Sequence, residues 1–241
     1  MVKCMAQESA PRAIDYIANI RLPTEKAHGI QIAKTCEAFV RAGSDLQLIV
    51  PTRENPITED PFTYYGISPR FPLVRVPVPD TMSWGVWGFR WQSIRFAFSG
   101  LAHLRKGSVV YGRDEMVLWI VSLFCTNPIV WESHTGSWNY FARSVAKRAR
   151  GIVAISQGLK DFYAVHGIPS ERIVVAHDGV DLSPFTQAET REVARRRLGL
   201  PHGKNVVLYI GRVDGWKDVE TLLAAAALLP ADTEVVVIGG E

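Results

Sequence analysis

Short runs of apolar, often β-branched residues recur along the chain and predict the strands of a sheet. Runs that are apolar at consecutive positions suit strands buried on both faces, as in a parallel sheet covered by helices. The predicted strands lie at residues 14–20, 46–50, 108–111, 129–132, 151–155, 172–176, 206–210 and 234–238.

Segments with apolar residues at helical spacing lie between several of these runs. One helix is predicted over residues 32–40, with Gly43 as its left-handed stop. Another follows Asp218, which we expect to cap it, and ends at Pro230. Strand and helix therefore alternate, which predicts an α/β protein with a Rossmann-like parallel sheet.

Two stretches interrupt this alternation. Residues 55–80 are rich in proline and have no clear period, so we expect an irregular excursion there. Residues 178–184 are typical of an interdomain link and divide the chain into domains 1–180 and 181–241. The second domain holds one strand, one helix and one strand, and a unit of this kind leaves both sheet edges unpaired. It either completes the first sheet or forms the first βαβ unit of a second Rossmann-like domain.

The composition is that of a globular protein. Of the 241 residues, 47% are hydrophobic and 21% are charged, which excludes a disordered chain and a collagen. The net charge of +3 is too small to indicate nucleic acid binding, although a pI of about 8.8 favours anionic partners.

The three cysteines, Cys4, Cys36 and Cys125, are far apart and form no C-x-x-C motif. Neither a disulfide framework nor a zinc site is indicated, and a reducing compartment fits this cysteine usage. Residues 1–12 contain no apolar signal core, and no apolar stretch approaches the length of a membrane span. We therefore expect a cytoplasmic protein.

The sharpest candidate site follows the predicted strand at residues 206–210. Ligands of open α/β sheets bind beyond the carboxyl ends of the strands. Arg212 comes directly after this strand end, and Lys217 stands at the mouth of the next helix. Two cations at a helix N-terminus suit a diphosphate. The alternative is that both are solvated surface cations.

Two further candidates follow other predicted strands. Gly29 opens a helix, where backbone amides can approach a phosphate closely; the alternative is an ordinary helix N-terminus. His134 follows a buried strand as a candidate acid, base or sugar-hydroxyl partner, and a structural histidine is its alternative. Arg113 and Asp114 follow a third strand, and we expect them to pair with each other.

A rival function is a serine hydrolase. Residues 154–158 approximate a nucleophile elbow around Ser156, with Asp178 or Asp181 and His202 as the remaining triad members. Ser156 is equally explained as a helix N-cap. No Asp-x-Asp motif is present to hold a divalent metal against a diphosphate, so no metal is expected.

Residues 82–105 combine tryptophans with arginines, among them Trp84, Trp87 and Trp91. Such a segment suits peripheral contact with a membrane surface or a lipid-linked acceptor. The alternative is that its aromatic side chains pack onto the sheet. The run Arg195–Arg197 predicts the solvated face of a short helix.

Several of these stretches together resemble a known family. The segments that carry the likeness are 25–31, 131–134, 154–160, 177–181, 206–212 and 216–223. They are similar to glycosyltransferases of family 4, which have the GT-B fold. The first two segments fit the acceptor domain, and the Gly-Arg…Lys pairing in a strand–loop–helix context fits the opening of the donor domain.

The resemblance implies a retaining transferase that moves a sugar from a nucleotide-diphosphate donor to a hydroxyl of a glycan or lipid-linked acceptor. In the family, the residues matching Arg212 and Lys217 grip the donor diphosphate, so neither metal nor other cofactor is implied. The residue matching His134 lies beside the donor sugar, and that matching Gly29 brings amides toward the phosphates.

The family's later Glu-x7-Glu motif has no counterpart in this sequence. We therefore expect a C-terminally incomplete chain that is inactive alone. The alternative is a non-catalytic fragment or half-subunit that binds an acceptor or a partner chain.

Overall fold

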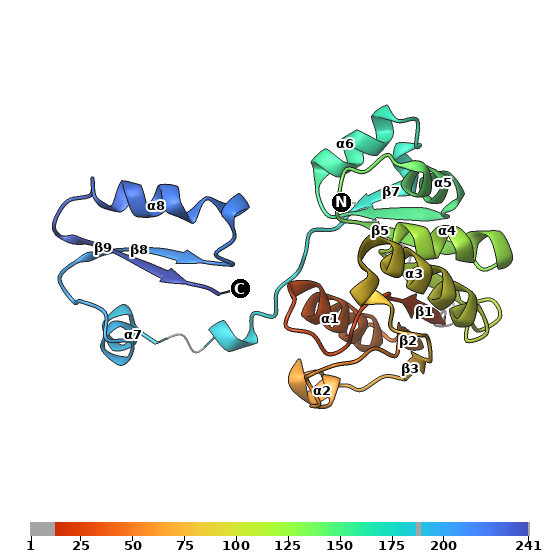
Figure 1. The fold of residues 1–241 in the computed structure, drawn as a ribbon, viewed down its shortest axis with the longest axis horizontal. Coiled ribbons are helices and arrows are strands. Elements are labelled where there is room, and N and C mark those ends of the chain that lie inside the picture. Colours follow the sequence, from red (N-terminus) through yellow and green to blue (C-terminus); the bar gives the residue numbers. More distant parts are fainter. Residues whose placement is uncertain (1–12, 187–188, 241) are drawn as a thin grey trace, which may run out of the picture. The chain divides into compact units, whose positions relative to one another are not determined.

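The computed structural model describes residues 13–186 and 189–240, and Figure 1 shows its helices and strands. The chain divides into two compact units, Met1–Gly179 and Val180–Glu241. The first unit contains β1 (Ile14–Ile17), α1 (Ala27–Arg41), β2 (Leu46–Pro51), α2 (Pro61–Tyr64), β3 (Leu73–Val76), α3 (Gly85–Leu101), β4 (Val109–Gly112), α4 (Glu115–Phe124), β5 (Ile129–Ser133), α5 (Tyr140–Arg148), β6 (Gly151–Ala154), α6 (Gln157–Val165) and β7 (Ile173–Val175). The second contains α7 (Arg191–Arg197), β8 (Asn205–Ile210), α8 (Val219–Ala226) and β9 (Thr233–Ile238).

The first unit is built on a seven-stranded sheet in the order β3-β2-β1-β4-β5-β6-β7. All of its neighbouring strands run parallel. This confirms the predicted α/β class and Rossmann-like sheet. The chain order reverses between β1 and β4, which is where open sheets of this type form their ligand crevice.

Helices cover both faces of this sheet, and the alternation of side chains along each strand separates two cores. Ile17 belongs to the core beneath α3, α4, α5 and α6, whereas its neighbour Tyr16 belongs to the core beneath α1 and α2. Tyr111 on β4 joins Tyr16 with the ring centroids 5.0 Å apart. The apolar runs of the sequence are thus explained by burial on two sides.

The stretch predicted to be irregular contains a helical turn, α2, and an edge strand, β3. The strand is only four residues long, and Arg75 within it is exposed, so it lacks the long apolar run that identifies a buried strand. Edge strands of this kind carry a weak sequence pattern because only one neighbour and one face are covered.

Residues 85–101 form a helix, α3, that the apolar pattern did not predict. Its buried side includes Gly88, Gln92 and Ser93 beside Phe96 and Ala97, and these small and polar residues interrupt the apolar period. The tryptophans of this segment do not pack onto the sheet: Trp84 just before the helix and Trp87 and Trp91 within it are all exposed.

The second unit forms a sheet of its own from β8 and β9, which pair in parallel, and does not complete the first sheet. Val219 is the sole buried residue in the described part of this unit. The helix α8 ends at Ala226 rather than at Pro230. Asp218 stands at its N-cap position with φ 51°, and its carboxylate accepts a hydrogen bond from the Thr221 hydroxyl instead of from a backbone amide.

The arginine run forms the end of α7, in which no residue is buried, as predicted. Cys36 and Cys125 are free thiols, and Cys4 lies outside the described residues. None of the helices in the described ranges combines the length and the hydropathy needed to cross a bilayer.

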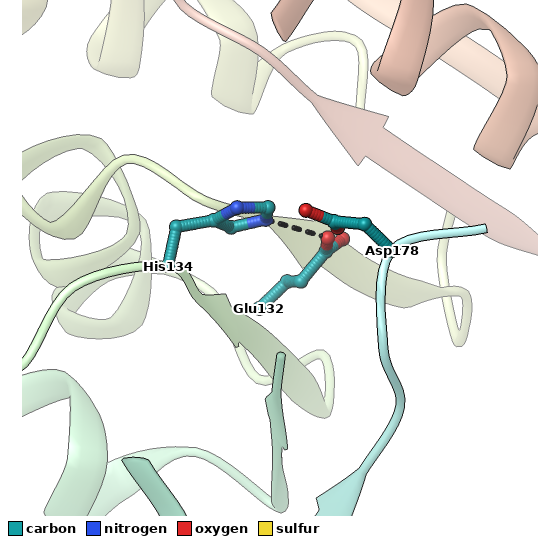
Figure 2. Close-up of side chains that lie close together, drawn as sticks. All are labelled: Glu132, His134 and Asp178. Atoms are coloured by element: carbon teal, nitrogen blue, oxygen red, sulfur yellow. Dashed lines mark hydrogen bonds and ion pairs between the residues drawn. The ribbon is translucent and has the colours of Figure 1, made fainter. Parts of the chain in front are cut away.

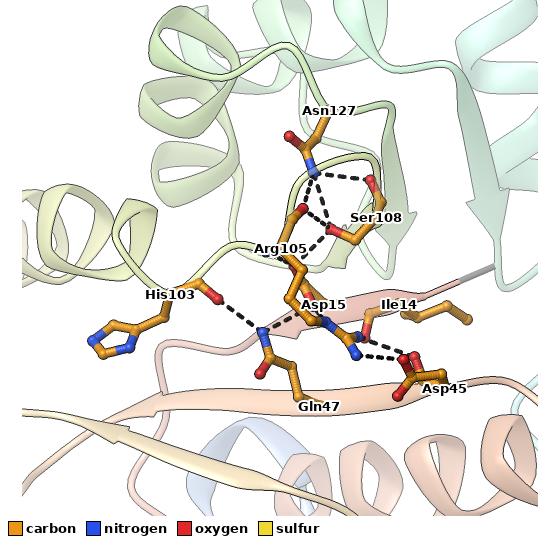
Figure 3. Close-up of polar contacts among 8 residues, drawn as sticks. All are labelled: Ile14, Asp15, Asp45, Gln47, His103, Arg105, Ser108 and Asn127. Carbon is orange, nitrogen blue, oxygen red and sulfur yellow. Dashed lines mark hydrogen bonds and ion pairs between the residues drawn. The ribbon is translucent and has the colours of Figure 1, made fainter.

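A buried polar network fixes the amino end of the sheet, on the edge away from the crevice (Figure 3). Asp15 on β1 is fully buried, and its carboxylate accepts hydrogen bonds from Arg105 Nε at 2.7 Å and Ser108 Oγ at 2.6 Å. Gln47 on β2 donates to the same carboxylate at 2.9 Å. Arg105 also pairs with the exposed Asp45 at 2.8 Å. The network therefore joins β1, β2 and the segment that leads into β4.

Replacing Asp15 by Asn should lower the free energy of unfolding by about 3 kcal/mol, because a buried pair loses one charge while Arg105 stays in place. The matched control is Asp45→Asn, which removes an exposed partner of the same arginine and should cost less than about 1 kcal/mol. Urea unfolding followed by circular dichroism measures both. Equal effects of the two substitutions would contradict this account of the network.

Candidate active site

The candidate site lies at the carboxyl ends of β4 and β5, beside the point where the strand order reverses. Tyr111 lies on β4 and Glu132 on β5, and the loops that follow these strands carry Arg113 and His134. The start of α1 brings Gln31 to the same edge, where its side-chain oxygen accepts a hydrogen bond from Arg113 Nη1 at 2.9 Å. The order of the parallel strands therefore brings together side chains that lie as far apart in the sequence as Gln31 and His134.

Glu132 is the centre of this cluster, and its side chain is almost fully buried. Its Oε2 accepts a hydrogen bond from the Tyr111 hydroxyl at 2.7 Å. Its Oε1 lies 2.8 Å from Arg113 Nη2 and 2.7 Å from His134 Nε2. A buried carboxylate is tolerated only with partners of this kind, because an unpaired charge in the interior is very costly.

The partners also decide the protonation of the carboxyl group. Burial raises the pKa of Glu132, but the hydrogen bond from His134, the charge of Arg113 and the hydrogen bond from Tyr111 together hold this pKa below its ordinary value. Burial raises the pKa of Tyr111, and the neighbouring Glu132 charge raises it further. Glu132 is therefore an ionised acceptor at neutral pH, and Tyr111 is a protonated donor.

This arrangement fixes the orientation of His134 (Figure 2). An ionised carboxylate only accepts hydrogen bonds, so the proton between the two groups belongs to Nε2 of the ring. In a neutral ring, Nδ1 is then left as an acceptor. The side chain is 25% exposed, so a ligand in the crevice can reach it.

Figure 2 also shows Asp178 beside Glu132 and His134, with one ligand atom from each residue within 4.8 Å of the others. This donor set fits a metal ion poorly. Oε1 of Glu132 already faces the Arg113 guanidinium, which would repel a cation, and Asp178 accepts a hydrogen bond from Gln31.

Gly29 lies in the first turn of α1, but packing accounts for it. A Cβ at this position would come within 2.3 Å of the Tyr65 hydroxyl oxygen and 2.5 Å of Thr24 Cγ2. The Gly29 amide donates to the Lys26 carbonyl at 2.9 Å. The start of α1 borders the crevice nonetheless, because Gln31 in its second turn contacts Arg113. Nearby, burial lowers the pKa of His28, and the charges of Lys26, Arg113 and Arg53 lower it further.

Arg212 and Lys217 lie in the second unit, on the loop after β8. The Arg212 guanidinium pairs with Asp214 through two contacts of 3.0 and 3.1 Å. Trp216 donates its indole N–H to the same carboxylate at 3.2 Å, and Lys217 Nζ lies 4.1 Å from the centroid of that indole. The two cations are thus held on one turn through Asp214 and Trp216. The pairing with Asp214 was not predicted, and a diphosphate has to displace it or bind beside it.

Ser156 has a structural role and is not placed as a nucleophile. It is the N-cap of α6, its hydroxyl accepts a hydrogen bond from the Leu159 amide at 3.2 Å, and its backbone is extended. A nucleophile elbow needs a strained turn at this point. His202, the proposed triad base, belongs to the other compact unit. The hydrolase interpretation therefore has no support.

The role of Glu132 was not predicted from the sequence, and the predicted partner of Arg113 is wrong. Asp114 does not pair with Arg113; it caps α4 by accepting from the Val117 amide at 2.8 Å. The available signal was Glu132 itself, a charged residue at the end of the apolar run Ile129–Ser133. A charge in such a run has to be paired, and the neighbouring strand end offered Arg113.

Comparison with known proteins decides the family. The sequence model of Glycosyltransferase Family 4 matches residues 29–184, more than half of the chain. This chain belongs to glycosyltransferase family 4. The match includes Gly29, Glu132 and His134, whereas Arg212 and Lys217 lie outside it.

Curated relatives of this family 4 chain are D-inositol 3-phosphate glycosyltransferases. The protein of that name from Mycolicibacterium gilvum is 41% identical over 91 residues, which is 38% of this chain and 20% of the relative. The one from Mycobacterium tuberculosis is 38% identical over 91 residues, again 38% of this chain and 18% of the relative. The aligned part is therefore about a fifth of these relatives' length.

Solved structures show the same GT-B glycosyltransferase fold. HepE from Anabaena, in complex with UDP and glucose, superposes with a TM-score of 0.65 at 15% identity, covering 94% of this chain and 60% of that one. The lipopolysaccharide outer core galactosyltransferase WaaB gives 0.62 at 16% identity, covering 95% and 61%. A putative UDP-N-acetylglucosamine 2-epimerase from Listeria monocytogenes gives 0.63 at 11% identity, covering 95% and 63%, so the fold alone does not set the reaction.

Replacing Glu132 by Gln should lower the free energy of unfolding at pH 7 by about 3 kcal/mol, because Arg113 loses its counter-charge. The pKa of Glu132 is depressed in the folded protein, so its contribution is present above the unfolded pKa of about 4.3 and is lost as pH falls through the folded pKa. Urea unfolding of both proteins at several pH values measures the difference. A variant as stable as the parent at pH 7, or a gap that does not narrow as the pH falls below about 4.3, would contradict the assignment.

Proposed function

We propose that this chain is part of a retaining glycosyltransferase that moves a sugar from a nucleotide-diphosphate donor to a hydroxyl of a glycan or lipid-linked acceptor. Membership of family 4 supports the reaction class. The observation that carries the proposal further is the imidazole of His134, which a buried, ionised Glu132 orients at the point where the strand order reverses.

His134 is the proposed catalytic residue beside the donor sugar. With its Nε2 on Glu132, its Nδ1 is available to accept a hydrogen bond from a sugar hydroxyl. Glu132 accepts hydrogen bonds from Tyr111 and His134 and forms an ion pair with Arg113, so it orients the histidine and does not act as a nucleophile. Gly29 is proposed to help bind the donor diphosphate through backbone amides at the start of α1, a turn that its missing side chain lets pack against Tyr65 and Thr24.

Arg212 and Lys217 are the proposed holders of the donor diphosphate. Negative charge grows on the departing phosphate oxygen as the bond to the sugar breaks, and two fixed cations stabilise that charge. This role needs neither a metal nor another cofactor. Their placement on one turn, joined through Asp214 and Trp216, supports the proposal.

Retention follows when the acceptor attacks the face of the sugar from which the diphosphate departs. The bond between the acceptor oxygen and the anomeric carbon forms, the bond from that carbon to the phosphate oxygen breaks, and the acceptor's proton passes to the departing phosphate. A double displacement would need a free carboxylate instead. Glu132 is engaged by Tyr111, His134 and Arg113, and Asp178 beside it accepts a hydrogen bond from Gln31, which supports direct transfer on one face.

The names of the relatives suggest which molecules to use as probes. HepE is described in complex with UDP and with UDP-glucose, so UDP is our first donor probe. D-inositol 3-phosphate is our first acceptor probe, taken from the curated relatives. Both choices are proposals, because this chain spans only part of each relative.

Calorimetric titration of this chain with UDP tests the diphosphate site. Arg212→Gln and Lys217→Gln should each weaken binding about tenfold or more, because a charge-assisted hydrogen bond contributes about 1.5–3 kcal/mol. Arg196→Gln is the matched control, since it removes an exposed cation from α7 in the same unit and should leave the affinity unchanged. Binding that survives both site substitutions, or no binding of UDP at all, would contradict this site.

A further inference from the structure

The outer side of α3 presents an unusual surface. Opposite its buried residues, five exposed side chains recur at spacings of three and four, and we call them the α3 stripe: Trp87, Arg90, Trp91, Arg95 and Phe98. At 1.5 Å per residue, the stripe is about 16 Å long. One side of α3 packs on the core, and the stripe lines the other side, where an ordinary amphipathic helix would carry polar residues.

The large apolar members of the stripe are exposed to solvent. Trp87 is 76% exposed, Trp91 49% and Phe98 48%. Trp84, just before the helix, is 70% exposed. A contiguous patch of this kind marks an interaction surface, because exposed aromatic rings keep a large apolar area in water.

The charge of the stripe is positive throughout. Arg90 Cζ lies 5.5 Å from the centroid of the Trp87 ring, and Arg95 Cζ lies 6.0 Å from that of Trp91. No acidic residue occurs in the sequence between Asp80 and Asp114. The aromatic rings are therefore interleaved with cations and have no anion within the segment to balance them.

The surface continues onto α4, which lies beside α3 in Figure 1. The rings of Phe98 and Phe124 are 5.1 Å apart, and Phe124 is 61% exposed. Leu123, also on α4, is 43% exposed. Two neighbouring helices thus present one apolar face.

We propose that the α3 stripe docks this chain on an anionic phospholipid bilayer. Tryptophan favours the boundary between headgroups and acyl chains, and arginine binds anionic headgroups while its stem stays in apolar surroundings. The helix is too short and too charged to span the bilayer, so it lies in the plane of the interface.

This interaction goes beyond the transfer reaction and does not depend on it. None of the stripe residues belongs to the Glu132 cluster or to the loop of Arg212 and Lys217. Failure of the bilayer proposal therefore leaves the proposed glycosyltransferase intact, and loss of UDP binding leaves the bilayer proposal intact.

Co-sedimentation of the whole 241-residue chain with lipid vesicles tests the proposal. One set of vesicles contains equal parts of phosphatidylcholine and phosphatidylglycerol, and the other contains phosphatidylcholine alone. We expect binding to the anionic vesicles, a blue shift of tryptophan emission, and loss of binding near 1 M salt, where the Debye length is about 3 Å. Arg90→Gln with Arg95→Gln should weaken binding about tenfold or more, and Trp87→Ala with Trp91→Ala at least as much.

Trp216→Ala is the matched control, because Trp216 is 75% exposed and also stacks with a cation but belongs to the second unit. It should leave vesicle binding unchanged. Circular dichroism and thermal unfolding check that the stripe variants are folded. Equal binding to neutral vesicles, no binding to either set, or an effect of Trp216→Ala as large as that of the stripe variants would overturn the proposal. Self-association of the chain that the tryptophan variants abolish, without vesicle binding, would assign the stripe to a second copy instead.

Discussion

A buried carboxylate held by two hydrogen bonds and one ion pair is the constraint on which the candidate active site depends. Glu132 is charged because Tyr111 and His134 donate hydrogen bonds to it and the Arg113 guanidinium balances its charge. The sheet makes this possible, since β4 and β5 are neighbours and their carboxyl ends bring those residues together. Removing the charge would release the arginine, the phenol and the imidazole at once. The orientation of His134 is therefore a property of the fold and not of one hydrogen bond.

The two halves of the proposed chemistry lie in separate compact units. The first offers an oriented histidine at the reversal of the sheet, and the second offers Arg212 and Lys217 on the turn after β8. The family match covers the first set and not the second. Arg212 is also paired with Asp214, so a diphosphate competes with a local carboxylate for the same guanidinium. The assignment of His134 to the donor sugar thus rests on burial and geometry, whereas the assignment of Arg212 and Lys217 to the diphosphate rests on charge.

Much of the fold could be predicted from the sequence because the central strands of the first sheet are buried on both faces and leave clear apolar runs, and the more exposed strands β8 and β9 carry similar runs. The pattern failed where burial is incomplete or polar: β3 is a short edge strand, and α3 buries Gln92 and Ser93 beside Phe96. The site was found only in part. His134 stood out at a strand end, but the pairing of Glu132 with Arg113 depends on which strands are neighbours, and that order is a tertiary property.

The most direct test of the account is the state of the His134 ring. Long-range proton–nitrogen NMR of the chain, with His134→Gln to assign the signal, reports which ring nitrogen carries the proton and whether that proton is hydrogen-bonded. We expect a proton on Nε2 with the downfield shift of a bond to a carboxylate, a bare Nδ1 in the neutral ring, and loss of the downfield signal in Glu132→Gln. A ring proton on Nδ1 alone, or a downfield signal that survives Glu132→Gln, would contradict it.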